Sequence, residues 1–181
     1  SGTLNPLNQG ITNPSPASQA FYIQDDDFNG VVEIIGVPEN TNFSGNNQTR
    51  IFSTKNACNF KMKNINFIEG YTTGSGAAIY FYSGRLELDS CNISGNSSTQ
   101  SNAYNGIYTY GGGSVLKMTN TTCEDSIYLY ATKATICNDC TIGTEYTDGF
   151  ITLDKSTLIL NGQNIVIIKP ILDTKTNIIY S

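Results

Sequence analysis

Short segments in which apolar and polar residues alternate recur along this chain. Residues 79–82, 107–110 and 127–130 share the pattern Ile-Tyr-x-Tyr, and residues 151–154 form a weaker fourth copy. Side chains of a strand point alternately to opposite faces, so the tyrosines share one face and the isoleucines share the other. We expect the copies to stack as parallel rungs about 4.8 Å apart, which places the tyrosines in two columns on one side of the molecule. These tyrosines are Tyr80, Tyr82, Tyr108, Tyr110, Tyr128 and Tyr130.

A second, eight-residue repeat accompanies the first. Apolar residues recur at its first, third and last positions, usually with Asn or Thr just before the last, in residues 60–67, 86–93, 116–123, 135–142 and 158–165. The copies start 26, 30, 19 and 23 residues apart, a period that suits one coil of a solenoid and is too short for a propeller blade. The apolar positions predict an inward stack, and the polar positions predict a ladder of hydrogen-bonding turns.

The residues that separate the apolar segments are those expected between the strands of an all-β protein. Helical periodicity is almost absent, and Gly, Asn, Ser and Thr separate short runs rich in Ile, Tyr, Thr and Val. We therefore predict an all-β fold, a parallel β-helix of about five to six coils. Residues 1–20 are expected to form an extended lead-in, and residues 21–181 a single domain that opens with a strand at 31–35. Residues 165–168 and 177–180 are expected to close it with apolar strands.

The amino-acid composition limits the expected location of the protein and the kinds of partner that it can bind. The chain has 10 basic and 15 acidic residues and no basic cluster, which disfavours nucleic acid as a partner. It also lacks a run of about 18 apolar residues, so we expect no membrane span. Low Lys and Arg content, abundant Asn, Ser, Thr, Gly and Tyr, and the absence of His and Trp are typical of secreted proteins. We expect an extracellular or cell-surface location.

Cysteines allow two interpretations. The simplest is that they are small buried apolar fillers. In the repeat register Cys91 and Cys140 share a column, and Cys137 shares an inward column with Leu88, so a Cys91–Cys140 disulfide across coils is the alternative. An odd total leaves at least one thiol unpaired. Without histidine, the Cys137–Cys140 pair does not predict a metal site, and we expect no cofactor.

Two further kinds of modification or ligand site are candidates. Five glycosylation sequons occur, no more than chance predicts, and Asn47 and Asn96 are the better acceptors because they fall on predicted loops. Asp25, Asp26 and Asp27 are expected to form a solvated turn, with a calcium site as the alternative.

The stretch from residue 74 to residue 96 resembles the repeats of a known family. Gly-Ser-Gly-Ala-Ala-Ile at 74–79, followed by Ile-Ser-Gly-Asn at 93–96, is similar to the repeats of polymorphic outer-membrane proteins and adhesin-like proteins, which carry Gly-Gly-Ala-Ile and Phe-x-x-Asn elements. The resemblance covers residues 74–96 and is weaker elsewhere. It implies a single-stranded right-handed parallel β-helix of the pectin-lyase-like group and a surface location.

Polysaccharide lyases and hydrolases are the alternative within that architecture, and the arrangement of the carboxylates disfavours them. Polysaccharide hydrolysis needs two carboxylates that converge on the sugar, and a pectate-type lyase needs a calcium-binding Asp cluster with a basic residue. Glu87 and Asp89 share one strand face, and in register they meet Lys61 and Lys63 one coil below. This predicts cross-rung charge pairing.

The tyrosine columns leave two functional readings open. They are either a self-supporting ladder of stacked rings or an exposed strip that binds glycan or a neighbouring subunit. We expect a non-enzymatic extracellular structural or adhesive module that self-assembles into a filament or layer. The alternatives are a glycan-binding adhesin domain of a longer protein and a carbohydrate-active lyase or hydrolase. The expected partners are copies of the chain itself, or glycans or proteins outside the cell.

Overall fold

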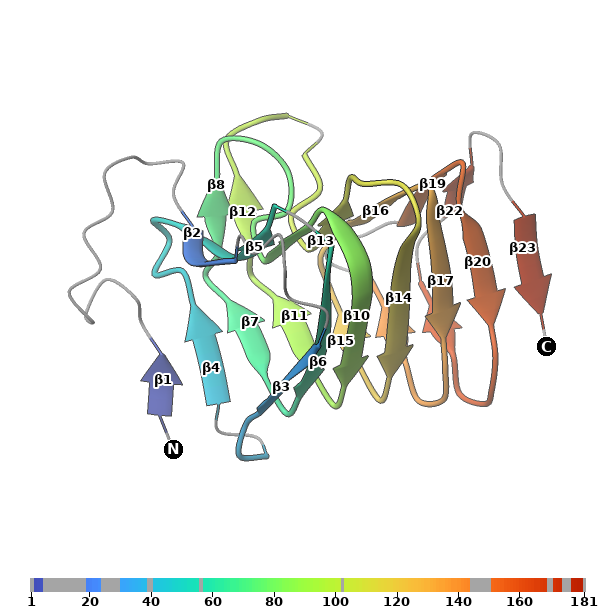
Figure 1. Ribbon diagram of the computed structural model, residues 1–181, viewed down its shortest axis with the longest axis horizontal. Coiled ribbons are helices and arrows are strands. Elements are labelled where there is room, and N and C mark those ends of the chain that lie inside the picture. The colour runs from blue at the N-terminus through green and yellow to red at the C-terminus, as the bar shows by residue number, and fades with distance from the viewer. Residues whose placement is uncertain are drawn as a thin grey trace.

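A computed structural model describes residues 2–4, 19–23, 30–38, 41–55, 57–101, 103–143, 151–168, 171–173 and 177–180 (Figure 1). The described chain contains strands and no helix, and its parallel strands stack as a β-solenoid of about five turns. Strands β1 and β23 lie at opposite ends of the stack (Figure 1). The predicted fold class is confirmed.

Three parallel sheets of seven strands each form the walls of the solenoid. Each sheet has more strands than the solenoid has turns, because the terminal segments add strands at both ends of the stack. We name the first the tyrosine sheet. Its strands, in spatial order, are β2 (Gln19–Ile23), β5 (Arg50–Thr54), β9 (Ile79–Phe81), β13 (Ile107–Thr109), β16 (Ile127–Tyr130), β19 (Ile151–Asp154) and β22 (Ile171–Asp173).

The second wall, the charged sheet, carries the first half of the eight-residue repeat. Its strands are β3 (Val31–Ile35), β6 (Ala57–Lys63), β10 (Ser83–Asp89), β14 (Ser114–Thr119), β17 (Thr132–Ile136), β20 (Thr157–Leu160) and β23 (Asn177–Tyr180).

The third sheet closes each coil. Its strands are β1 (Gly2–Leu4), β4 (Thr41–Ser44), β7 (Asn66–Ile68), β11 (Asn92–Ser94), β15 (Thr122–Cys123), β18 (Thr141–Ile142) and β21 (Val166–Ile167). Two short strands, β8 (Tyr71–Thr72) and β12 (Ser97–Ser98), pair outside these walls. Strand β2 runs across the predicted boundary at residue 20, and both β1 and β2 belong to the solenoid sheets.

Inward side chains form continuous apolar columns, as the alternation predicts. In the tyrosine sheet Ile79, Ile107, Ile127 and Ile151 are in register and almost fully buried. The charged sheet stacks Phe60, Leu86, Leu116, Ala134 and Leu158 in the same way. Since each coil buries its apolar side against its neighbours, the core is one continuous stack.

The fourth copy of the eight-residue repeat begins one residue earlier than the sequence predicts. Leu116 pairs with Ala134, so Ile136 continues the column of Leu88 and Met118, and Cys137 lies outside it in the following turn. The turn after Ile136 holds one residue more than the turns after Leu88 and Met118. The last position of this copy, Ile142, does align with Cys123. A fixed length of eight residues before Ile142 therefore places the start of the copy one residue too late.

The fifth copy differs at its other end. Leu158 aligns with Ala134, but Ile167, and not Ile165, aligns with Ile142. Here the longer turn includes Gly162 and Asn164, both with positive φ.

The polar turns between the charged and third sheets are built on left-handed backbone. Each of five successive turns has one non-glycine residue with positive φ, namely Asn64, Ser90, Asn120, Asp139 and Asn164. Asn and Asp tolerate this conformation better than most residues. Side chains link neighbouring coils in these turns, where Asn164 Nδ2 donates to Asp139 Oδ1 at 2.7 Å, and at the start of the third-sheet strands, where Asn66 Nδ2 donates to Asn42 Oδ1 at 2.9 Å. The predicted ladder of hydrogen-bonding turns is present at these positions.

Candidate functional site: the tyrosine face

The two predicted tyrosine columns lie on the outer surface of the tyrosine sheet, which we call the tyrosine face. In the first column the ring centroids of Tyr80 and Tyr108 are 5.4 Å apart, and those of Tyr108 and Tyr128 are 4.9 Å apart, with nearly parallel planes. In the second column Tyr110 lies 6.1 Å from Tyr82 and 6.3 Å from Tyr130. Register of the strands therefore produces one connected array of rings.

A seventh tyrosine completes the array. Tyr104 lies on the loop between β12 and β13, and its ring centroid is 4.8 Å from Tyr128 and 6.2 Å from Tyr108. Sequence reasoning missed it, because a single aromatic residue in a polar, non-repeating loop has no periodic pattern.

Cations cover both ends of the tyrosine face. The Arg50 guanidinium lies 4.7 Å from the centroid of Tyr80, and Lys155 Nζ lies 5.1 Å from that of Tyr130. Arg50 also donates to the carbonyl oxygens of Ser75 and Gly76, both at 2.9 Å. Burial lowers the pKa of Arg50 from its ordinary value. Arg50 thus fixes the segment before β9 onto β5 and closes the first column.

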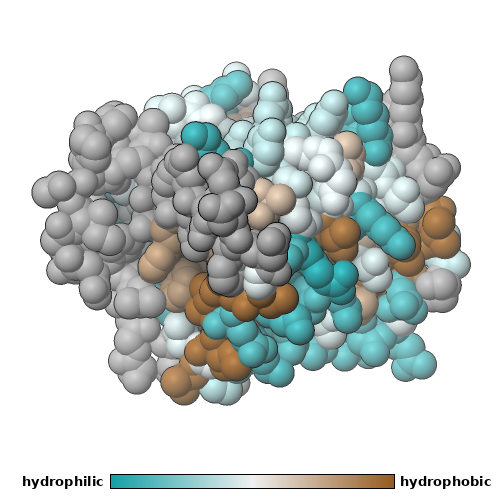
Figure 2. Space-filling view, in the orientation of Figure 1, coloured by the Kyte–Doolittle hydropathy of each residue, from teal (hydrophilic) through white to brown (hydrophobic). Residues whose placement is uncertain are grey.

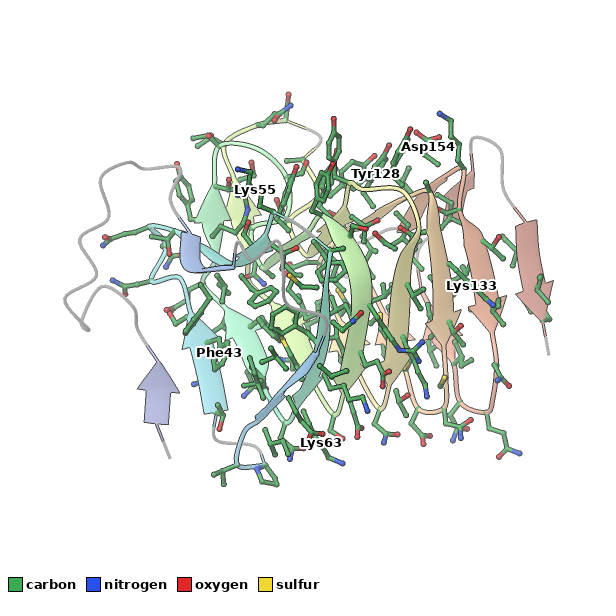
Figure 3. The ribbon with its side chains drawn as sticks, viewed as in Figure 1. Phe43, Lys55, Lys63, Tyr128, Lys133 and Asp154 are labelled. Carbon is green, nitrogen blue, oxygen red and sulfur yellow. The ribbon has the colours of Figure 1, made fainter. Side chains whose placement is uncertain are left out.

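Asp154 occupies the position at which the tyrosine pattern ends. It pairs in register with Tyr130, and its Oδ2 accepts a hydrogen bond of 3.0 Å from the Tyr128 hydroxyl. Both side chains lie at the upper edge of the solenoid in Figure 3. Burial, and then the hydrogen bond to Asp154, hold the pKa of Tyr128 far above its usual value; burial also raises the pKa of Tyr80 and Tyr108. These phenols are neutral at physiological pH.

Ring packing limits what the tyrosine face presents to solvent. Tyr110 is 52% exposed and Tyr82 is 41% exposed, whereas the other four predicted tyrosines are half-buried. Since the rings of the first column stack on one another, much of their faces is covered, whereas Tyr82 and Tyr110 of the second column are tilted by 47°. The geometry favours a self-supporting ladder over a platform on which sugar rings stack face to face.

Carboxylates on the charged sheet form ion pairs. Lys63 Nζ lies 2.9 Å from Asp89 Oδ2, which confirms the cross-rung pairing predicted for Asp89, while Glu87 pairs with Arg85 on its own strand. The hydrogen bond to Asp89 raises the pKa of Lys63. Burial alone would raise the pKa of Asp89, but hydrogen bonds from Lys63 and Ser90 bring it below its usual value. An outward column alternates in sign through Glu33, Lys61, Glu87 and Lys117.

The structure contradicts Asn96 as a glycosylation acceptor. Its side chain is buried: Nδ2 donates to Asp125 Oδ2 at 2.7 Å and to the Phe67 carbonyl at 3.1 Å, and Oδ1 accepts the Gly70 N–H at 2.8 Å. A glycan would replace one of the two hydrogens on Nδ2, and so would remove at least one of the bonds that Nδ2 donates inside this buried site. Asn47, in contrast, lies exposed in the turn after β4, so it remains a candidate.

Asp125 is the titratable partner of Asn96. Burial raises its pKa to about 6, although Asn96 donates two N–H groups to it. A carboxyl whose pKa is raised by folding stabilises the fold fully below its unfolded pKa, and this contribution is lost as the pH rises through the folded value.

We expect the Asp125→Asn variant to gain free energy of unfolding relative to wild type by ~2 kcal/mol as the pH rises from about 4 to about 7.5. Urea denaturation of both proteins across this range measures the difference. A difference that stays constant with pH would show that Asp125 is not the group responsible.

The cysteines are all free thiols in the structure. Cys91 and Cys140 do share a column, but Thr121 lies between them, because Asn92 pairs with Thr122 and Thr122 pairs with Thr141. Two rungs separate the Cα atoms of these cysteines by about 9–10 Å, too far for a disulfide. The filler interpretation is confirmed for the four buried cysteines, and burial raises the pKa of Cys91 to about 11.

Other candidate chemistry finds no support in the described part of the chain. Those residues contain no group of three or more His, Cys, Asp or Glu side chains that could hold a metal ion. Asp25, Asp26 and Asp27 lie outside the described residues. No helix among the described residues is long and apolar enough to cross a membrane.

Comparisons of the chain with protein-family models, with curated proteins and with solved structures find no match. The tyrosine face and the two ends of the stack are the features of the molecule that bear on its function.

Proposed function

We propose that this chain is a non-enzymatic structural module of an extracellular surface, which assembles end to end through the edge strands of the charged sheet. Strands β3 and β23 are the outermost strands of that sheet, and within the described residues each pairs with one neighbour. An unpaired parallel edge offers backbone N–H and C=O groups to another chain. The sheet therefore has a docking edge at each end.

Exposed apolar side chains at both edges are the observation that carries this proposal. Val31 is 55% exposed and Ile35 is 62% exposed on β3, and Tyr180 is 76% exposed on β23. Figure 2 shows an apolar area over β3 beside the hydrophilic centre of the same sheet. Exposed hydrophobic surface of this kind marks interaction sites.

A second copy is the occupant that fits these edges. The inward columns end in half-buried Val32 and Ile34 at one end, and in half-buried Ile178 and exposed Tyr180 at the other. Laying β3 of one copy beside β23 of the next continues the parallel sheet and brings these columns together. Such a head-to-tail contact does not close on itself, so repeated copies form a filament.

We expect the wild-type chain to form end-to-end polymers as its concentration rises, and the Val31→Lys/Ile35→Lys variant to remain monomeric. Lysine on an edge strand blocks strand addition. Light scattering after size exclusion and negative-stain images measure both. Val115→Lys is the matched control, since Val115 lies in the same outward column as Val31 but inside the sheet.

A wild-type chain that stays monomeric at every concentration, or an edge variant that polymerises like wild type, would refute the assembly. A monomer that a glycan array retains would instead support the adhesin alternative. The resemblance of residues 74–96 to adhesin-like repeats supports a surface location in either case.

A further inference from the structure

We propose that the tyrosine face is a one-electron redox site, in which a hole taken up at Tyr110 passes through Tyr108 to Tyr128 and is held there as a neutral phenoxyl radical beside Asp154. The oxidant is a diffusible one-electron acceptor such as a metal polypyridyl complex or a peroxyl radical. This inference does not depend on end-to-end assembly.

Ring geometry provides the path. Tyr110, at 52% exposure, is the most accessible ring of the face. Its centroid lies 6.3 Å from that of Tyr108 with planes 16° apart, and Tyr108 lies 4.9 Å from Tyr128 with planes 13° apart. Aromatic rings at these separations are close enough for an electron to pass between them. No step of the path needs a side chain to change position.

Tyr128 has a base in place for its proton. Oxidation turns a phenol into a very strong acid, so the proton must leave with the electron. The Tyr128 hydroxyl already donates to Asp154 Oδ2 at 3.0 Å. In the step, the oxidant gains one electron, the O–H bond of Tyr128 breaks, and an O–H bond forms on Asp154. Re-reduction by a one-electron donor returns the electron to Tyr128, and Asp154 returns the proton.

Positive charges at the ends of the face favour Tyr128 as the resting place of the hole. Arg50 lies over the ring of Tyr80. Lys155 lies over the ring of Tyr130, and its Nζ donates to the Tyr130 hydroxyl at 3.3 Å. A nearby cation opposes removal of an electron from a ring, whereas a carboxylate favours it. The charge arrangement thus makes Tyr80 and Tyr130 harder to oxidise and Tyr128 easier.

Photogenerated tris-bipyridine ruthenium(III), with persulfate as the terminal electron acceptor, provides the test. We expect freeze-quench electron paramagnetic resonance of the wild-type chain to show one dominant, hydrogen-bonded tyrosyl radical. Tyr128→Phe keeps the stacked ring but has no hydroxyl, so that radical should disappear. Asp154→Asn keeps the size of the side chain but removes the base, and should slow radical formation about tenfold, the loss of roughly one charge-assisted hydrogen bond.

Tyr71→Phe is the control, because Tyr71 lies on β8, outside the tyrosine face and away from the path; rate and spectrum should stay as in wild type. Wild-type oxidation should also be slower in D2O. An unchanged spectrum in Tyr128→Phe would overturn the proposal. Equal rates in wild type and Asp154→Asn, or equal rates in H2O and D2O, would overturn the transfer of the proton to Asp154.

Discussion

The Asn96→Asp variant is expected to lose about 3–5 kcal/mol of its free energy of unfolding near pH 7, the cost of leaving a buried charge unpaired. Asn96 is buried, and its amide nitrogen donates both to Asp125 Oδ2 and to the Phe67 carbonyl. Aspartate has no N–H to donate, so it places a second carboxylate 2.7 Å from the first. Gly70 N–H keeps its acceptor, but the remaining partners face repulsion.

Urea denaturation of Asn96→Asp beside Asn92→Asp measures this loss. Asn92 is half-buried on the same coil, and its amide donates to the Ser94 hydroxyl, so the control variant should lose less than about 1 kcal/mol. The gap between the two variants should narrow toward about pH 4, where protonation relieves the repulsion. Equal transition midpoints near pH 7 would contradict the role assigned to the Asn96–Asp125 contact.

The Phe60→Ala variant is expected to lose about 3–5 kcal/mol, the usual cost of a large core cavity. Phe60 is almost fully buried in the column between Val32 and Leu86, and its ring meets Phe52 of the tyrosine sheet edge to face at 5.0 Å. Neighbouring strands are held in parallel register, so the walls of the cavity cannot collapse easily. The substitution removes both the contact of Phe60 with Phe52 between the two sheets and the largest side chain at this level of the column.

Chemical denaturation and hydrogen exchange test this prediction together. Since each coil contacts only its neighbours, loss of exchange protection should be greatest in β3, β5 and β6 and smaller toward β20. Lys61→Ala, on the outward side of β6, is the control and should change stability by less than about 0.5 kcal/mol. A Phe60→Ala chain as stable as this control, or one that loses protection equally everywhere, would contradict the stacked-column account.

The sequence predicted the rungs well because alternation of apolar and polar residues is the physical requirement of a strand with one buried face. The predicted alignment of strands is wrong where the number of residues between two strands depends on the length of a turn. Thr135 was placed in the column that Ala134 occupies, because the turn before Ile142 has an additional residue that leaves no hydropathy pattern. The longer turn keeps a residue with positive φ, Asp139, as the shorter turns do, so only its length differs.

The tyrosine face was predictable only in its repeating part. Its six repeated tyrosines follow from strand register, but Tyr104, Arg50 and Lys155 reach it from non-repeating positions. Asn96 shows the opposite failure. A sequon is a pattern of three adjacent residues, whereas the buried Asn96 side chain bonds to Asp125, which lies on the next coil and outside that pattern.

Corners between the third sheet and the tyrosine sheet differ greatly in length, while the strands on either side keep their register. Cys123 is joined to Ile127 by a short corner, whereas the segment from Ile93 to Ile107 carries β12 and Tyr104. The longer corner leaves the apolar columns undisturbed. Foreign peptides grafted into it would therefore be displayed beside the tyrosine face, one per copy, and in the end-to-end assembly proposed above they would repeat once per length of the solenoid.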